Sequence, residues 1–222
     1  MTLPTPSPRL PLHRAPRSLS LARALVAAAA AATLLGACAP LLIGGAMLGT
    51  AMVVTDRRSS GTQIDDQGIE LKAINVVNRV LGDRGHVNVT SFNRLVLVTG
   101  EVPTEADKAA VESAITRIEN VHSIVNELAV AGASSLTSRS NDTLLTSKVK
   151  ASLIDAKDLQ AHAFKVVTER GVVYLMGRVT EREAKRASDV ARGVSGVQKV
   201  VRVFELVTEA ELADLKPKPA AQ

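Results

Sequence analysis

The sequence has no tryptophan, and aromatic residues make up only 2% of its 222 positions. Its hydrophobic core must therefore be built from valine, isoleucine, leucine and alanine. The four histidines are isolated, with no HExxH or similar metal-ligand spacing: His13, His86, His122 and His162. Neither a Gly-x-Ser-x-Gly nucleophile motif nor a phosphate-binding Walker loop is present. These absences argue against an enzyme, and we expect no catalytic residue, no cofactor and no metal.

Cysteine occurs once, at Cys38, so the chain cannot form an internal disulfide. Residues 1–37 place four arginines before an apolar stretch, Ala24–Leu35, which is the arrangement of a bacterial secretory signal. The segment Leu35-Gly36-Ala37-Cys38 resembles the lipobox of bacterial lipoproteins. That resemblance implies that the signal peptide 1–37 is removed and that Cys38 is lipidated, with diacylglycerol on its thiol and an acyl chain such as palmitate on its amine. A redox or catalytic cysteine is the alternative.

Residues 38–61 are interpreted as a lipidated tether. Within them, Leu41–Val54 is apolar and rich in glycine, but it is shorter than the ~20 residues that span a bilayer. If the signal were retained, Ala24–Val54 could instead form one long membrane helix. The second residue of the mature chain would be Ala39, not the aspartate that resembles an inner-membrane retention signal. We therefore expect the outer membrane.

The net charge of +5 belongs mostly to the signal. Four of the 27 basic residues and none of the 22 acidic residues precede Cys38, which leaves +1 for the mature chain. This balance gives no argument for nucleic-acid binding. The charge is unevenly divided, because residues 62–130 carry a net of −4 and residues 137–208 a net of +5.

An internal repeat organises the mature chain. Residues 94–115 align with residues 171–192, and in each copy an apolar run, a glycine and a charged residue precede a helix-capping threonine. The caps are Thr104 and Thr180, each followed three residues later by an acidic residue at the capping-box spacing. The second helix of each copy is therefore predicted to begin directly after its threonine.

Other patterns complete each copy as α-β-β-α-β. They predict first helices over Asp65–Leu81 and Asn141–Ile154, strands within 86–92, 121–130, 164–170 and 197–207, and turns at Asn93-Arg94 and Arg170-Gly171. Asn141 and Asp142 are expected to cap their helix, and Asp65 and Asp66 to lie at a helix start, where the dipole favours them over a catalytic role. The fold class is α+β, with two helices packed on one face of a three-stranded sheet in each domain.

This α-β-β-α-β unit, with its strand, glycine and capped helix, resembles the BON domain. Residues 62–130 would form the first domain, 131–140 a linker, 141–208 the second domain and 209–222 a C-terminal tail. The stretches 61–71, 140–153 and 173–200 resemble the family of dual-BON-domain outer-membrane lipoproteins. The resemblance implies a lipid-anchored, periplasm-facing protein that binds anionic phospholipid through its second domain. It also implies roles in envelope integrity and cell division, near the outer-membrane protein assembly machinery.

The first helix of the second domain is the predicted lipid-binding element. A stripe that includes Leu145 and Val149 should pack on the sheet, which leaves Leu144 and Lys148 exposed one turn apart beside it. An exposed apolar residue next to lysine suits a membrane interface. Lys150 is a weaker candidate on the flank. The alternative for Leu144 is a packing contact between the two domains.

Two functions remain open from the sequence. The first is an outer-membrane lipoprotein that binds anionic phospholipid, such as phosphatidylglycerol or cardiolipin, and supports envelope integrity. The second is a protein-interaction adaptor, in which the acidic first domain or its sheet edge docks on a partner in outer-membrane protein assembly or cell-wall remodelling.

Overall fold

The structure is a computed structural model that describes residues 56–214. The predicted signal, Cys38 and all but the last residues of the predicted tether lie outside the described residues. Both repeats belong to one compact unit of the chain, residues 51–222.

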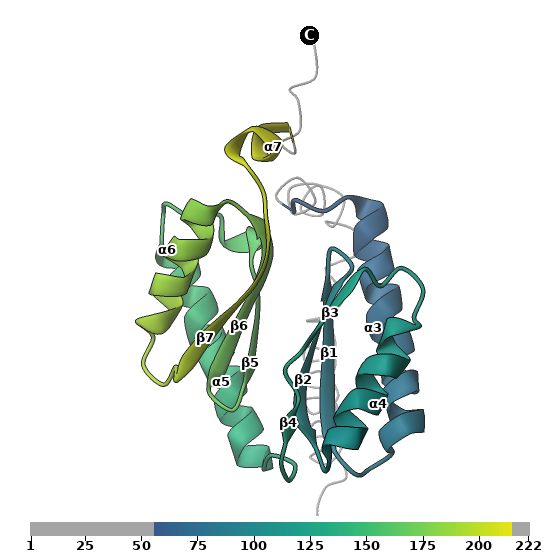
Figure 1. The fold of residues 1–222 in the computed structure, drawn as a ribbon. Coiled ribbons are helices and arrows are strands. Elements are labelled where there is room, and N and C mark those ends of the chain that lie inside the picture. The colour runs from purple at the N-terminus through teal and green to yellow at the C-terminus, as the bar shows by residue number, and fades with distance from the viewer. Residues whose placement is uncertain (1–55, 215–222) are drawn as a thin grey trace, which may run out of the picture. The chain divides into compact units, whose positions relative to one another are not determined.

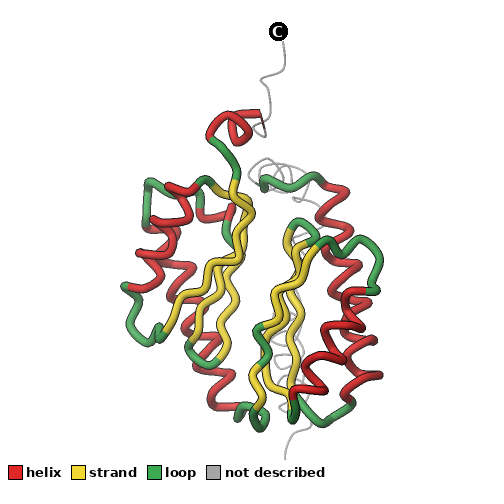
Figure 2. Tube along the Cα trace, in the orientation of Figure 1, coloured by secondary structure: helices red, strands yellow, loops and turns green. Residues whose placement is uncertain are grey.

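Each repeat has the predicted α-β-β-α-β order (Figures 1 and 2). The first repeat consists of α3 (Ser60–Leu81), β1 (His86–Phe92), β2 (Leu95–Val102), α4 (Glu105–Thr116), β3 (Ser123–Asn126) and β4 (Ala129–Val130). The second consists of α5 (Leu136–Asp155), a short 3-10 helix (Ala161–Ala163), β5 (Lys165–Glu169), β6 (Val172–Val179), α6 (Glu181–Arg192) and β7 (Lys199–Leu206), and α7 (Glu209–Asp214) follows it. The predicted α+β class is confirmed.

The two sheets share one topology. In each, the first two strands form an antiparallel hairpin and the strand after the second helix pairs parallel to the middle strand. In the first repeat this last strand is interrupted, so that β3 and β4 pair with successive parts of β2 in the same register. In the second repeat β7 is continuous and pairs with β6 along its whole length.

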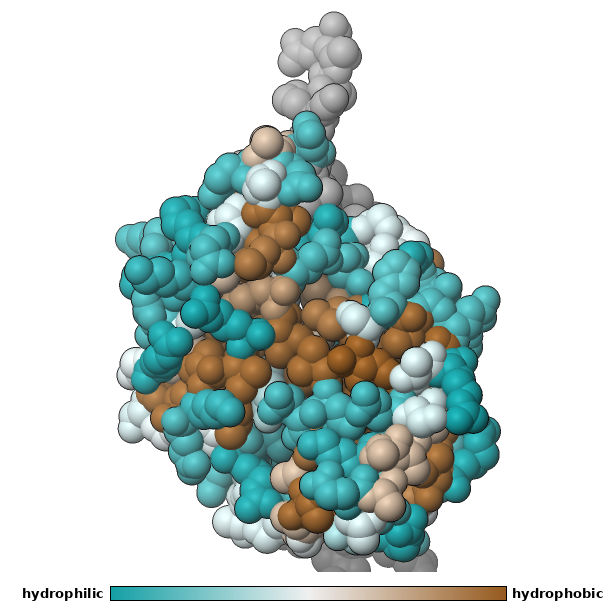
Figure 3. Space-filling model, viewed as in Figure 1, coloured by the Kyte–Doolittle hydropathy of each residue, from teal (hydrophilic) through white to brown (hydrophobic). Residues whose placement is uncertain are grey.

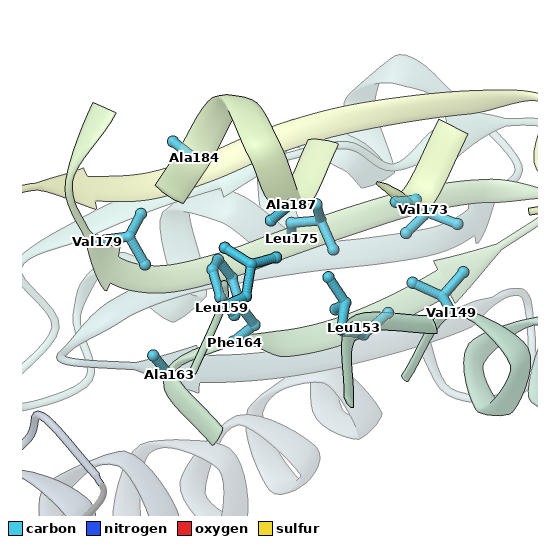
Figure 4. Packing of buried hydrophobic residues seen from close by; sticks show 12 residues of the cluster. Val149, Leu153, Leu159, Ala163, Phe164, Val173, Leu175, Val179, Ala184 and Ala187 are labelled. Atoms are coloured by element: carbon cyan, nitrogen blue, oxygen red, sulfur yellow. The ribbon is translucent and has the colours of Figure 1, made fainter. Parts of the chain in front are cut away.

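Each repeat has its own hydrophobic core between its helices and one face of its sheet. In the first repeat this core is built by Ile69, Ala73, Val77, Leu81, Val96, Val98, Val102, Val111, Ile115, Ile118 and Leu128. In the second, α5 and α6 pack on β5 and β6, and small alanines on α6 allow a close approach (Figure 4). These cores contain the aliphatic residues that the composition required.

The opposite face of each sheet is also apolar. Along β6, Val173 and Leu175 point into the helix-covered core, whereas the alternate residues Tyr174 and Met176 join a third cluster with Val203. Residues of the first sheet belong to the same cluster, namely Phe92 and Leu97. Figure 3 shows hydrophobic residues in a broken band across the middle of one face, where the strands lie. The repeats thus have separate cores and share a third, which the sequence analysis did not anticipate.

Both first helices begin five residues earlier than predicted. Ser59 caps α3 by accepting a hydrogen bond from the Thr62 amide, and Ser135 caps α5 in the same way through Ser138. Serine is among the preferred capping residues. Each helix therefore begins within the polar stretch and not after it. The predicted linker 131–140 is therefore helical from Leu136 onward.

Other predicted boundaries also shift. The last residues of the predicted tether 38–61 are part of the fold, because Ser60 and Gly61 lie in α3. Part of the predicted C-terminal tail 209–222 is helical, since Glu209–Asp214 form α7 with Leu212 buried. The caps Thr104 and Thr180 are confirmed, and Thr180 forms a full capping box with Glu183.

Asp142 was predicted to cap α5, and this prediction is wrong. The residue lies within the helix, on its buried face. Its carboxylate accepts hydrogen bonds of 2.8 Å from the backbone N–H groups of Arg170 and Gly171. These two residues form the turn between β5 and β6, and both have positive φ, 51° and 73°. Two consecutive positive φ values are typical of the tight turns that match the twist of a hairpin. The predicted turn is confirmed, and Asp142 holds it against the helix.

Asp66 has the same role in the first repeat, and it too lies within its helix and not at the helix start. It is buried, and it accepts hydrogen bonds of 2.8 and 2.7 Å from the N–H groups of Asn93 and Arg94. Its neighbour Asp65 forms an ion pair with Arg94 at 2.6 Å. The two aspartates therefore have a structural explanation.

Replacing Asp142 by Ala should lower the free energy of unfolding by about 2–4 kcal/mol, because the two amides of the hairpin turn would lose their charged acceptor. Asp142→Asn, which retains one carbonyl acceptor, should fall between this variant and the parent. The matched control is Asp155→Ala, at the exposed end of the same helix, with an expected change within ~0.5 kcal/mol. Urea unfolding followed by circular dichroism measures all three, and equal stabilities for Asp142→Ala and Asp155→Ala would contradict this role.

Candidate functional site

The predicted lipidation residue, Cys38, lies outside the described residues. Within residues 56–214, no helix combines the length and the hydropathy needed to cross a bilayer. The same part of the chain holds no group of three or more His, Cys, Asp or Glu side chains placed to share a metal ion.

The outer face of α5 is apolar and basic. Three large aliphatic side chains stand exposed along it, with exposed fractions of 79% for Leu136, 62% for Leu144 and 65% for Ile154. The other exposed side chains between them are small, hydroxyl-bearing or amide groups and two lysines. From Leu136 to Ile154 the sole acidic residue is Asp142, which is buried under the hairpin turn. The exposed acidic residue Asp155 is the last residue of α5, so from Leu136 to Ile154 this face offers apolar surface without an exposed negative charge.

Lys148 and Lys150 lie on either side of this face, about 200° apart around the helix axis. Both are exposed, and in the described part of the chain neither takes part in an ion pair. By contrast, the arginines of α6 are engaged: Arg182, Arg186 and Arg192 each contact an acidic side chain. The two lysines are thus available to an external anion.

A hollow of about 520 Å³ lies beside Leu144 and Lys148. Three segments line it: residues 138–148 of α5, the turn between β5 and β6, and the loop between α6 and β7. The lining residues are Ser138, Asn141, Asp142, Leu144, Leu145, Lys148, Arg170, Gly171, Ser195, Gly196 and Gln198. The structure thus brings Leu144 and Lys148 together, as predicted, and adds a second cation, Arg170, and several polar side chains to them.

The turn and the loop meet through close backbone contacts. The Gln198 amide donates a hydrogen bond to the Gly171 carbonyl at 2.9 Å. A Cβ atom on Gly171 would lie 3.0 Å from the Gln198 side chain, and its φ of 73° is one that other residues rarely adopt. Glycine therefore permits this approach. Together with the Asp142 hydrogen bonds, it fixes the walls of the hollow.

Lys148 separates this hollow from a second one. The second hollow, of about 560 Å³, lies between α5 and α6, and Lys148 and Ser195 line both. Its walls include the aliphatic residues Ala151, Val190 and Val194. The Lys148 amine can therefore donate a hydrogen bond to a polar group in the first hollow. The aliphatic part of the same side chain can cover apolar surface in the second.

The structure does not bring Lys150 to this site. Lys150 lines a different hollow, of about 270 Å³, together with Ile154, His162 and Phe164 among others. Its place is the opposite flank of the outer face. Leu144, for its part, is exposed in the structure instead of packing between domains.

Sequence reasoning missed Arg170 and Ser195. Arg170 was recognised as a turn residue, but its proximity to α5 follows from the Asp142 hydrogen bond, which no local pattern predicts. Ser195 lies in the loop that follows α6, more than 40 residues from Lys148. The repeat pattern predicts that such a loop exists, but not which helix it contacts.

Buried carboxyl groups lie behind the hairpin turn. Glu169 is 7% exposed and accepts a hydrogen bond of 2.9 Å from the Asn88 side chain. Glu101 is fully buried, 3.7 Å from the Arg170 guanidinium. Burial raises the pKa of Glu169, and the charges of Glu101 and Asp142 raise it further, although the hydrogen bond from Asn88 opposes the shift. The ionised form of Glu169 is therefore disfavoured in the folded state.

Two tandem copies of one α-β-β-α-β unit define the class of protein to which this chain belongs. The BON domain family model matches residues 65–132 and 141–208. Outer membrane lipoprotein DolP of Haemophilus influenzae is 36% identical over 85% of this chain and 98% of that protein. The chain belongs to the BON domain family, as a dual-BON protein of the DolP type.

Two further relatives match about two thirds of the chain. The protein named 21 kDa hemolysin of Actinobacillus pleuropneumoniae is 32% identical over 68% of this chain and 79% of its own length. Osmotically-inducible protein Y of Escherichia coli is 29% identical over 63% of this chain and 72% of its own length. The dual-BON architecture expected from the sequence is confirmed by the family match.

Glu169→Gln should melt at a higher temperature than the parent at pH 7. Because the pKa of Glu169 is raised in the folded state, protonated Glu169 favours folding. This contribution to the free energy of unfolding is fully present below the ordinary pKa of 4.5 and is lost as the pH rises through the raised pKa. Glutamine is neutral at every pH and avoids this loss. Melting curves from pH 4 to pH 8 measure the effect, and a difference between parent and variant that is largest at the acid end would contradict the assignment.

Proposed function

We propose that this protein is a lipoprotein of the outer membrane, facing the periplasm, whose second BON domain binds anionic phospholipid through the outer face of α5. Phosphatidylglycerol and cardiolipin are the expected lipids. The protein acts by binding and not by catalysis, and it supports envelope integrity, as its family resemblance implies.

The observation that carries the proposal is the composition of the outer face of α5. Leu136, Leu144 and Ile154 supply apolar side chains, and Lys148 and Lys150 flank them with no exposed acidic residue between. A helix of this kind lies in the interface of a bilayer, with its apolar side chains among the acyl chains and its lysines at the level of the phosphates. Both flanks then carry a cation, which explains why Lys150 need not share the hollow of Lys148.

The hollow beside Lys148 gives the headgroup a place. Lys148 and Arg170 can meet a phosphate, and the hydroxyl and amide groups of Ser138, Ser195 and Gln198 can hydrogen-bond to glycerol. Each basic residue near an anionic surface contributes about 1 kcal/mol, so the isolated domain binds weakly. A lipid anchor compensates, because it keeps the domain next to the bilayer.

Cys38 is the proposed anchor. Its position after a secretory signal supports lipidation, and the relative from Haemophilus influenzae is named an outer membrane lipoprotein. Several acyl chains hold a protein firmly at a membrane, whereas one chain holds it marginally.

A second candidate function is protein docking by the first domain. The outer face of α3 also exposes large aliphatic residues, with Ile64 at 70%, Leu71 at 66% and Ile74 at 56%. These residues favour the adaptor hypothesis, with a partner in outer-membrane protein assembly or cell-wall remodelling. Lys72 on this helix is already paired with Glu119, unlike the lysines of α5.

Cys38→Ala should release the protein from the membrane fraction or leave an uncleaved precursor without function, because no lipid can be attached. Cell fractionation and mass spectrometry of the N-terminus measure this. A variant that stays in the membrane pellet, uncleaved and with normal function, would support the spanning-helix alternative.

Leu144→Ala should weaken binding to phosphatidylglycerol vesicles by about 5- to 30-fold, since 1–2 kcal/mol of apolar insertion is lost. Lys148→Glu should weaken it by about tenfold or more at low salt, and the loss should shrink at high salt. Vesicle sedimentation with residues 56–222 measures both, because this span lacks the apolar tether.

Two controls separate binding from folding. Lys185→Glu makes the same charge change at an exposed position on α6, so it should weaken binding far less than Lys148→Glu. Leu145→Ala removes a buried side chain, so it should lower the melting temperature instead. If Leu144→Ala bound vesicles like the parent and melted far lower, the outer face of α5 would not be the lipid surface.

A further inference from the structure

Arg57 fastens the chain just before α3 to the second domain, although this residue lies within the predicted lipidated tether 38–61. The Arg57 guanidinium makes a two-pronged contact with the Glu183 carboxylate, with both N–O distances 2.8 Å. It also donates to the Arg178 carbonyl at 2.8 Å and to the Gln160 side chain at 3.1 Å. The side chains of Arg57 and Glu183 are only 6% and 5% exposed. Such a pair is costly to break, because either partner alone would be a buried charge.

Glu183 is held in place independently of Arg57. It is the acidic residue of the capping box of α6, where it accepts a hydrogen bond of 3.1 Å from the Thr180 amide. Burial opposes ionisation of Glu183, but the hydrogen bonds from Arg57 and Thr180 prevail and lower its pKa. The carboxylate is thus a fixed, charged receptor at the start of α6.

The next residue, Arg58, fastens the same segment to the first domain. It forms ion pairs with Asp56 at 2.7 Å and with the buried Asp66 at 2.8 Å. Its guanidinium lies 4.3 Å from the centre of the Phe92 ring, a cation–π contact. Two consecutive arginines therefore hold the root of the tether, one on each domain.

We propose that Arg57 and Glu183 form a clasp that fixes the point at which the lipid tether leaves the fold, beside α6 of the second domain. Without this pair the chain would leave from the start of α3, in the first domain. Arg57 follows Cys38 by 19 residues, which span at most about 65 Å. The clasp therefore attaches the anchor to the domain that carries the α5 face. Arg57 is a positioning residue, and its bearing on membrane orientation rests on the proposed function.

The test uses trypsin, which cleaves after arginine, on the full chain. In the parent, cleavage after Arg57 and Arg58 should be slow, because the segment must first leave the clasp. Glu183→Gln retains an oxygen for the capping box but removes the charge, so it should speed this cleavage by about tenfold or more. The products are identified by mass. Unchanged cleavage in Glu183→Gln would overturn the proposal.

The matched control is Asp107→Asn in the first domain. Asp107 occupies the same position after the α4 cap Thr104, and it pairs with an exposed arginine, Arg84, not with the tether. It should leave cleavage after Arg57 and Arg58 unchanged. Equal acceleration by both variants would mean general loosening of the fold and would contradict the clasp.

A second variant covers the case in which Glu183→Gln unfolds α6. Arg57→Gln leaves the capping box intact and should speed cleavage after Arg58 to a similar degree. The double variant should be no faster than the faster single variant, because both changes open the same contact. Additive acceleration would overturn the proposal. The assay needs no lipid, so its result is independent of whether Cys38 is acylated or α5 binds phospholipid.

Discussion

A buried aspartate in the second turn of each first helix makes the contact on which the rest of the repeat depends. Helix interiors satisfy their own backbone groups, so the carboxylates of Asp66 and Asp142 are free to serve the amides of a neighbouring turn. Those turns have left-handed backbone, and their N–H groups donate to the buried carboxylates. Each aspartate thereby fixes three things together: the rotation of the helix, the register of the hairpin and the distance between them. In the second domain, the same bond turns Leu145 toward the core and Leu144 toward solvent.

Much of this fold could be predicted from the sequence, because local chemistry encodes it. The capping threonines Thr104 and Thr180 begin their helices, and both turns occur where Asn93-Arg94 and Arg170-Gly171 predicted them. The errors at the first helices arise because a short polar side chain can hydrogen-bond to nearby or to distant backbone. Asp142 was predicted to cap its own helix, whereas it caps a turn 28 residues away.

Parts of the candidate site could also be predicted from the sequence, and other parts could not. The exposure of Leu144 and Lys148 follows from helical periodicity, which a single sequence contains. The contributions of Arg170 and Ser195 depend on how the turn and the loop after α6 meet α5, and this is decided by tertiary contacts. Lys150 is only two residues from Lys148 in the sequence, but it lies on the opposite flank of the helix. Closeness in sequence therefore does not place two side chains in the same site. The contacts of Arg57 could not be predicted from the sequence either, because an arginine beside an apolar segment is equally consistent with a solvent-exposed charge.

The two domains share a fold but present different outer surfaces. Both α3 and α5 expose aliphatic residues, so apolar exposure alone does not distinguish a membrane contact from a protein contact. The distinction lies in charge. Lys148 and Lys150 lack acidic partners within the described chain and belong to the domain of net charge +5, whereas Lys72 is paired and belongs to the domain of net charge −4. The contact of Arg57 with Glu183 adds that the chain before α3 is held against the basic domain.

The most direct measurement is the depth of single side chains in a bilayer. An environment-sensitive fluorophore is attached to a cysteine introduced at Leu144 or, in a second protein, at Leu71, in the full chain bound to vesicles with and without phosphatidylglycerol. Cys38 is the only native cysteine, so its acylation or its replacement by serine leaves one reactive thiol. We expect a blue-shifted signal, quenched by nitroxide lipids, at position 144 but not at position 71, and only with the anionic lipid. A buried probe at position 71 with a solvent-exposed probe at position 144 would contradict this expectation.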